Sequence, residues 1–447
     1  MYYEKLRNLV KSGNLRILLV IAPPRSSSTL MEKTLSFSPS VNLVSHEPFM
    51  CVGYSELDPD LGYKSIIDSV NSRGPIKGGS VVVIKDMAHW LTAREEHRNF
   101  FRLIYDPIML MIRNPLLSTE SRIRKVVQAI SINPRVSTQR YILEVFACNH
   151  GYKGWAQMRE QMSKKPNESS SIDVDLEMAD LGKAYYHPDN MLQEKLLNYF
   201  AAKSGFADWD DFVRSSLKSR DYTLLEKALK FDDHRFAPEL SGWKELDRLA
   251  DYLKANNHPF LIVDSTEFRL DPEGIMKKIT DKLNIIFADG MINWTKPLVK
   301  VSSEQERSQD LIWYDTLMKS TNIKPPVELL PRLADFPSAV KENLKKIDFP
   351  VYFKLFGKME RIQGQMGLDQ KQYSVKVPEN LKLKFSDAGI KVGQGEGEAN
   401  VTIQDVDPVF SVLYNPSLLK NKAYLARKRY YEEEFSLVRR MFDGRGI

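Results

Sequence analysis

Short runs of apolar, β-favouring residues recur along the chain without the alternation that marks a half-buried strand. They cover residues 17–21, 81–84, 108–112 and 260–263, and a weaker run covers 41–44. Uniform apolarity indicates a strand that is covered on both faces, as in a parallel sheet packed between helices. We therefore expect each run to be a strand of one parallel sheet.

Segments in which apolar residues recur at the spacing of a helix separate these runs, for example at 246–254. Strands that alternate with helices predict an open parallel α/β sheet with right-handed crossovers. Residues 118–254 are mostly of helical character, with a polar stretch at 164–171 that is typical of an exposed loop. A helical segment at 339–356 is expected to close the core.

The chain has 447 residues, enough for one large domain with additions. We expect an α/β domain over residues 1–365, with a large helical insertion at about 130–235. A C-terminal extension of unknown role follows at 366–447. Within it, residues 375–385 alternate like an edge strand, and residues 425–442 have the pattern of a charged amphipathic helix.

Composition and charge narrow the classes of function. Apolar residues make up 43% of the chain and charged residues 27%, which excludes a disordered chain. The net charge of +6 comes from 64 basic and 58 acidic residues spread along the chain, so no nucleic-acid groove is expected. The two cysteines, Cys51 and Cys148, provide neither a disulfide framework nor zinc spacing. The first apolar run is too short for a signal peptide or a membrane span, so we expect a cytoplasmic protein without membrane contact.

A turn rich in hydroxyl groups follows the first predicted strand, and a segment whose apolar residues have helical spacing follows the turn. Two prolines end the strand, and Arg25 precedes four hydroxyl side chains, those of Ser26, Ser27, Ser28 and Thr29. The unpaired N–H groups of a helix N-terminus favour a bound phosphate or sulfate. The turn lacks the glycines and lysine of the Walker A pattern, which argues against an ATPase or kinase. A serine-rich helix cap without ligand is the alternative interpretation.

A second candidate anion site follows the predicted strand at 108–112. Arg113 leaves this strand, followed by Asn114 and Pro115, and Ser121 comes eight residues after the arginine. Open α/β sheets bind ligands at the carboxyl ends of their strands, so this pair could hold a second phosphate. The alternative is an arginine that pairs with an acidic residue, beside a capping serine.

These segments, in this order, resemble the PAPS-dependent sulfotransferase superfamily, where PAPS is 3'-phosphoadenosine 5'-phosphosulfate. Its first turn reads Pro-Lys/Arg-Ser-Gly-Thr-Ser/Thr, and residues 24–29 match four of these six positions. Ser27 stands where the family usually has glycine, and Ser28 where it usually has threonine. The family's 3'-phosphate motif begins Arg-Asp/Asn/His-Pro, with a serine eight residues after the arginine, as at Arg113 and Ser121.

Further segments resemble landmarks of a poorly characterised sulfotransferase-like subgroup, and the resemblance covers about residues 15–355. The similar segments are 46–49 (His-Glu-Pro-Phe), 84–89, 242–244, 263–265, 291–294, 313–314 and Ser320. The resemblance implies a P-loop-NTPase-like three-layer sandwich with a central parallel sheet. It also implies PAPS as the sulfuryl donor, adenosine 3',5'-bisphosphate as the product, and no metal. The expected partners are a small-molecule acceptor, as in biosynthesis, and a second copy of the chain in a homodimer.

The resemblance also suggests which residues act in sulfuryl transfer. Arg25 and the helix N-terminus would stabilise charge, because arginine does not readily give up a proton. Glu47 is our candidate general base, and His46 is its neighbour. Adjacent strand residues point to opposite faces, so we expect only one of them to serve. Lys85 could reach the sulfonate or pair with Asp86.

Two other interpretations remain open on the sequence. A P-loop-like kinase or other nucleotide-dependent transferase would bind ATP with Mg²⁺. A non-catalytic nucleotide-binding protein would keep the fold without turnover, since fold does not fix function.

Overall fold

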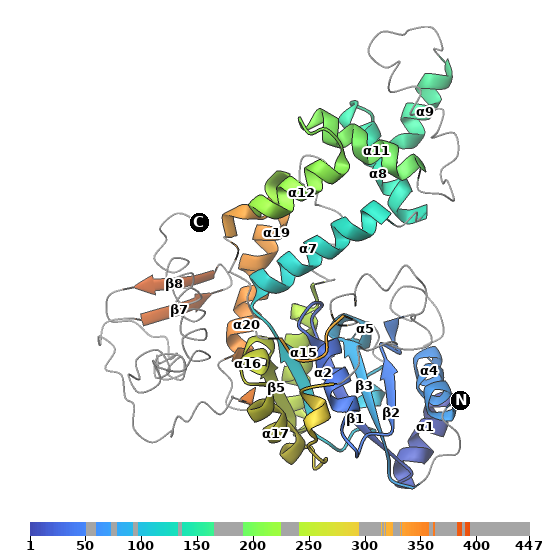
Figure 1. The fold of residues 1–447 in the computed structure, drawn as a ribbon, viewed down its shortest axis with the longest axis vertical. Coiled ribbons are helices and arrows are strands. Elements are labelled where there is room, and N and C mark those ends of the chain that lie inside the picture. Colours follow the sequence, from blue (N-terminus) through green and yellow to red (C-terminus); the bar gives the residue numbers. More distant parts are fainter. Residues whose placement is uncertain are drawn as a thin grey trace.

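A computed structural model gives the fold. It describes residues 1–50, 60–72, 78–92, 97–132, 136–164, 191–224, 241–294, 314, 317, 319–324, 331, 333–356, 361–362, 382–386 and 389–393. Within these residues the protein is an α/β structure with a central parallel sheet (Figure 1).

The sheet has five strands of four or more residues, and every strand pair in it is parallel. Their spatial order is β2 (Leu43–His46), β3 (Ser80–Met87), β1 (Leu15–Ala22), β4 (Ile108–Ile112) and β5 (Phe260–Asp264). A two-residue strand, β6 (Arg361–Ile362), pairs with β5. All the strands predicted for the parallel sheet are confirmed, although the one predicted at 41–44 begins and ends two residues later.

Helices cover both faces of the sheet, because β1 and its neighbours direct apolar side chains to both sides. On one face, Leu15, Ile17, Leu19 and Ile21 pack in a common core with helices of that layer. These helices are α1 (Tyr2–Lys11), α4 (Asp60–Asn71), α15 (Trp243–Ala255) and α20 (Phe349–Phe356).

On the other face, Leu18, Val20 and Ala22 pack against α2 (Ser28–Ser36) and α17 (Pro272–Lys282). The two clusters explain why the strand runs are uniformly apolar. The arrangement is compatible with a three-layer sandwich.

The strand order places a topological switch between β1 and β4, which are hydrogen-bonded neighbours. Helix α2, which follows β1, lies on one face, whereas α15, which precedes β5, lies on the other. In open α/β sheets such a point leaves a crevice outside the carboxyl ends of the strands. Both predicted anion motifs follow strands at this point.

The described helices between 115 and 219, which include part of the insertion expected at about 130–235, form a layer with its own core, and Figure 1 shows it projecting from the sheet. Its described helices are α7 (Pro115–Ile132), α8 (Val136–Asn149), α9 (Trp155–Lys164), α11 (Met191–Lys203) and α12 (Trp209–Ser219). Arg220, just after α12, donates two hydrogen bonds of 2.7 and 2.6 Å to Glu120 of α7. This pair ties the end of α12 to α7, the helix that leaves β4.

The predicted helix at 339–356 forms, but with a change of geometry in its middle. It consists of α19 (Ser338–Asn343), the π-helix η7 (Leu344–Asp348) and α20. The other short helices are α5 (Ala88–Thr92), α6 (Arg98–Phe101), α16 (Ser265–Leu270), η3 (Asp289–Met291) and η6 (Leu333–Asp335).

The described part of the C-terminal extension is a two-stranded antiparallel ribbon. It pairs β7 (Lys382–Ser386) with β8 (Gly389–Gly393). The ribbon contains residues 382–385 of the edge strand expected at 375–385, and residues 375–381 lie outside the described residues. The predicted helix at 425–442 and nearly all of the predicted loop at 164–171 lie outside them too. Among the helices of the described residues, none combines the length and apolarity that a membrane crossing needs.

Candidate anion-binding site at the switch point

The turn after β1 forms the N-terminus of α2. Helix α2 begins at Ser28, and its first intrahelical bond runs from Met31 N to Ser27 O at 3.1 Å. The side chain of the N-cap residue, Ser27, makes no capping hydrogen bond. The N–H groups of residues 28–30 lie in the first turn and therefore have no intrahelical acceptor. Ser26 is fully buried, and its hydroxyl has no hydrogen-bond partner in the described structure. The turn thus offers unpaired donors at the positive end of a helix.

Backbone strain is concentrated at the predicted site. The non-glycine residues with positive φ in the described structure include Arg25 at 66°, Ser27 at 60° and Glu47 at 45°. The remaining ones are Arg220, Asn257 and Asn284. Asparagine tolerates this region, whereas other residues there cost free energy that functional sites often retain. A φ of 60° at Ser27 is a conformation that glycine adopts without strain.

The two predicted anion motifs contact each other. Arg25 Nε donates to Ser121 Oγ at 3.1 Å, and Arg113 Nη1 donates to the carbonyl oxygen of Arg25 at 3.1 Å. Arg113 is buried at the end of β4, with its guanidinium towards the turn. Both motifs therefore belong to one polar cluster at the switch point.

Two of the later landmark segments also contact the turn. Ser265 Oγ, directly after β5, donates to Ser27 Oγ at 2.7 Å. Gly242 lies so close to the turn that an added Cβ would be 3.2 Å from Pro24 Cδ. Segments distant in sequence thus fix the conformation of the turn.

The two candidate bases, His46 and Glu47, belong to a buried ionic network that also includes Glu32 of α2. Lys85 of β3 donates to Glu47 Oε1, so the carboxylate that pairs with it is that of Glu47 and not the expected Asp86. His46 Nδ1 is hydrogen-bonded to the carboxylate of Glu32. His46 Nε2 is 3.0 Å from Tyr314 Oη and 3.4 Å from Glu47 Oε1. The side chains of His46, Lys85 and Glu32 are completely buried.

Charge pairing in this network determines the protonation states. Burial alone would raise the pKa of Glu47, but Lys85 and His46 hold that pKa far below its ordinary value. Burial opposes the charged form of His46, yet Glu32 raises the pKa of the imidazole above its ordinary value. Glu47 is therefore ionised and paired, which makes it a weak proton acceptor as long as Lys85 remains beside it.

The expectation that His46 and Glu47 point to opposite faces is wrong. His46 is the last residue of β2, and Glu47 follows it with a φ of 45°. The left-handed turn breaks the alternation of the strand and brings both side chains into one network.

Two neighbouring titratable residues have strongly shifted pKa values. Burial raises the pKa of Asp86 to about 7, and the charge of Glu47 adds to the effect. Its carboxylate accepts hydrogen bonds from the backbone N–H groups of Phe49 and Met87. Burial lowers the pKa of His89 to about 3, with a contribution from the charge of Arg122. His89 is therefore a neutral imidazole at neutral pH.

Sequence reasoning missed Glu32, which orients His46. The available signal was its spacing: Glu32 lies one helical turn after Ser28, so it shares a face with the N-terminus of α2. Among the described residues, no group of His, Cys, Asp and Glu side chains is arranged to hold a metal ion. Compared with known proteins, the chain matched no family model, no curated protein and no solved structure.

Proposed function

We propose that this protein is a PAPS-dependent sulfotransferase on a P-loop-like α/β fold. One observation carries the proposal: Arg25, Ser121 and Arg113 form a contiguous polar surface beside a helix N-terminus, at the switch point of a parallel sheet. A bisphosphorylated nucleotide needs two oxyanion sites on one side of the protein, and we infer that these residues supply both.

The side chains of the turn fit the 5' end of such a nucleotide. The N–H groups of residues 28–30, the unpartnered hydroxyl of Ser26 and the guanidinium of Arg25 would hold its phosphosulfate. Arg113 and Ser121 would hold the 3'-phosphate. Ser27, already hydrogen-bonded to Ser265, would contribute mainly its backbone.

When bound, PAPS would supply a sulfuryl group, whose bond to the phosphate oxygen breaks as a bond to the acceptor oxygen or nitrogen forms. Arg25 and the α2 N-terminus stabilise negative charge on the departing phosphate. Glu47 takes the proton of the acceptor, with His46 beside it. Because Lys85 suppresses the basicity of Glu47, this role requires the ammonium group to turn towards another anion, such as a sulfonate.

The second candidate function is a non-catalytic nucleotide-binding protein. The observation in its favour is the closed ion pair of Glu47 with Lys85, which leaves no ready proton acceptor. An ATP-dependent kinase is less well supported, because the turn lacks the Walker lysine and glycines.

Mass spectrometry of an acceptor panel incubated with PAPS tests the proposal. The wild type should form a sulfated product, Arg25→Ala should lose activity, and Glu47→Gln should lose kcat more than affinity for PAPS. A panel without product, together with tight binding of adenosine 3',5'-bisphosphate, would establish the non-catalytic alternative. A thermal shift with ATP–Mg²⁺ but not with the bisphosphate would establish a kinase-like protein.

A further inference from the structure

A buried carboxylate, that of Glu32, lies on the helix whose N-terminus forms the candidate anion site. Its side chain is completely buried, and its Oε2 is hydrogen-bonded to His46 Nδ1. Its other oxygen, Oε1, has no hydrogen-bond partner in the described structure. Because desolvation disfavours an isolated charge, a buried carboxylate needs a cation beside it. His46 is placed to supply that charge.

The same imidazole faces a second carboxylate with its other nitrogen. His46 Nε2 lies 3.4 Å from Glu47 Oε1 and 3.0 Å from Tyr314 Oη. A neutral imidazole has one N–H group and can donate to only one of the two carboxylates, whereas an imidazolium donates to both. Lys85, which donates to Glu47, is the other cation of the network. With a charged His46, two carboxylates and two cations balance in this buried cluster.

The titratable groups that face His46 favour its charged form. Burial opposes the charge, Glu32 raises the pKa of His46, and the charge of Lys85 lowers it. Hydrogen bonds to Glu32 and Glu47 raise it further, so the pKa lies above its ordinary value. Tyr314, the remaining neighbour of the ring, can accept a hydrogen bond from the imidazolium.

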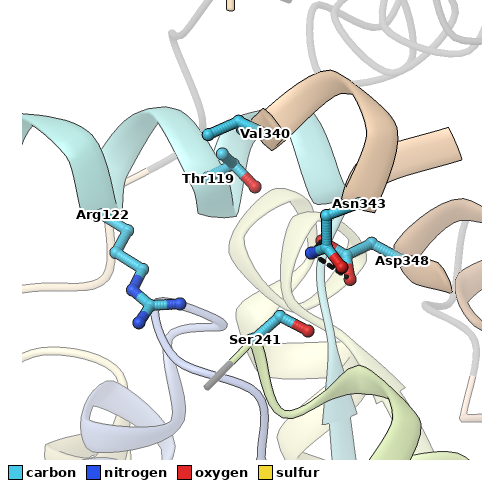
Figure 2. A pocket seen from close by; sticks show the side chains of 6 residues that line it. All are labelled: Thr119, Arg122, Ser241, Val340, Asn343 and Asp348. Atoms are coloured by element: carbon cyan, nitrogen blue, oxygen red, sulfur yellow. Dashed lines mark hydrogen bonds between the residues drawn. The ribbon is translucent and has the colours of Figure 1, made fainter. Parts of the chain in front are cut away.

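A carboxyl group elsewhere in the protein shows what burial does without a closely paired cation. Asp348 is 2% exposed, and its hydrogen bonds join it to Asn343 and Ser241, which are neutral groups. Figure 2 shows Arg122 across a small hollow from the pair of Asn343 and Asp348. Burial raises the pKa of Asp348 to about 7, against the hydrogen bond with Ser241 and the charge of Arg122. Such a group carries a proton in about half of the molecules at neutral pH.

Glu47 would lose one of its cations whenever Lys85 turned to a sulfonate, as the proposed function requires. Burial then acts to raise the pKa of Glu47, and a protonated Glu47 cannot take the proton of an acceptor. The charge of Glu47 also acts on Asp86 and His89, but these offer no replacement, since one is an acid and the other a neutral imidazole. A charged His46 beside Glu47 is the group that keeps this carboxylate ionised.

We propose that Glu32 is a positioning residue: it holds His46 as an imidazolium, which stays beside Glu47 and keeps that carboxylate ready to take a proton. His46 keeps its own proton throughout, so the proton of the acceptor goes to Glu47. The role of Glu47 as base rests on the proposed sulfotransferase function, whereas the charge of His46 does not. Glu32 acts through His46 and touches no substrate.

NMR titration of histidine and glutamate side chains tests the proposal without a ligand. The ¹⁵N signals of His46 report whether one or both ring nitrogens carry a proton, and His46→Gln identifies them among those of the seven histidines. Glu32→Gln removes the charge of Glu32 with little change in size. Asp348→Asn removes another buried carboxyl group and is the control variant. Lys85→Met imitates the state in which the ammonium group has turned away, and the carboxyl ¹³C signal of Glu47 is followed in it.

Both ring nitrogens of His46 should be protonated at pH 7 in the wild type and in the control. In Glu32→Gln, His46 should be neutral at pH 7, with a pKa below its ordinary value of about 6.5, because burial and Lys85 then dominate. In Lys85→Met, addition of Glu32→Gln should raise the pKa of Glu47. A neutral His46 in the wild type, a His46 titration that Glu32→Gln leaves unchanged, or an unchanged pKa of Glu47 would each overturn the proposal. The wild-type spectrum decides alone where a variant does not fold.

Turnover and nucleotide binding separate this proposal from the proposed function. With PAPS and the acceptor panel, Glu32→Gln should lower kcat at least about tenfold at pH 6, and the loss should shrink as the pH rises towards 8. Affinity for adenosine 3',5'-bisphosphate should stay within about twofold. An equal loss of kcat at every pH would indicate a merely structural role for Glu32 and overturn the proposal. A charged His46 in a protein that binds no bisphosphate would refute the sulfotransferase function and leave the pair of Glu32 and His46 standing.

Discussion

Replacement of Lys85 by methionine should strongly destabilise the protein, because it leaves a buried carboxylate without its cation. Lys85 is fully buried, and Glu47, to which it donates, is 8% exposed. Removal of one partner from a buried ion pair costs about 3–5 kcal/mol. His46 still faces Glu47 in the variant, so we expect a loss near the lower limit, about 3 kcal/mol at pH 7.

The pH dependence of this loss gives the sharper test. In the wild type the pKa of Glu47 is lowered, so its stabilisation is present above the unfolded pKa of about 4.3 and is lost as the pH falls below it. Without Lys85, burial raises the pKa of Glu47 above its unfolded value. The variant then gains stability relative to the wild type as the pH falls from about 7 to about 5, because Glu47 takes up a proton on folding.

Urea denaturation at the two pH values measures both effects. Glu47→Gln combined with Lys85→Met should recover most of the loss, because no uncompensated charge remains. Lys354→Met is the matched control: Lys354 pairs with Asp247 at 2.6 Å and Asp251 at 2.9 Å but is 42% exposed, so it should cost less than about 1 kcal/mol. The reasoning is refuted when Lys85→Met costs no more than this control, or when its deficit grows on acidification.

Three further outcomes follow from the geometry of the site. Ser27→Gly should change the free energy of unfolding by less than about 1 kcal/mol, because the relief of a φ of 60° offsets the lost hydrogen bond to Ser265. Ser27→Val should cost at least about 2 kcal/mol, and equal costs of the two variants in urea denaturation would contradict this. Gly242→Ala should lower the free energy of unfolding more than Gly205→Ala, because both glycines have positive φ but of these two only Gly242 lacks room for a Cβ. The same loss in both variants would refute the close contact between Gly242 and the turn. Imidazole NMR should find His89 neutral from about pH 5 to about pH 8. His46 should titrate above its ordinary pKa of about 6.5, so its stabilisation is present below that ordinary value and is lost as the pH rises through the raised pKa; a normal titration of either residue would be inconsistent with the buried network.

The parallel sheet could be predicted because its strands are apolar on both faces, a pattern that periodicity reveals directly. The strand Ile108–Ile112 was predicted to the residue, since polar residues flank it on both sides. The two anion motifs were predicted as a pair because each follows such a strand. Their contact through Arg25 and Ser121 depends on strand order, which the apolar pattern does not encode.

Other parts of the site depend on local backbone geometry that has no strong sequence signal. The positive φ of Glu47 reverses the expected direction of its side chain relative to His46. Glu32 reads as an ordinary helix residue until the fold places it against His46. The π-helix that aligns Asn343 with Asp348 interrupts a segment whose apolar pattern predicts a continuous helix.

The central claim is that Arg113 and the turn after β1 bind opposite ends of one nucleotide. Calorimetric titration of adenosine 3',5'-bisphosphate and adenosine 5'-monophosphate, each with the wild type and with Arg113→Met, tests it directly. The wild type should bind the bisphosphate about 10- to 100-fold more tightly, the value of one or two hydrogen bonds between charged groups. Arg113→Met should abolish this preference and keep its affinity for the monophosphate. Equal binding of both nucleotides by the wild type, or an unchanged preference in the variant, would contradict the account.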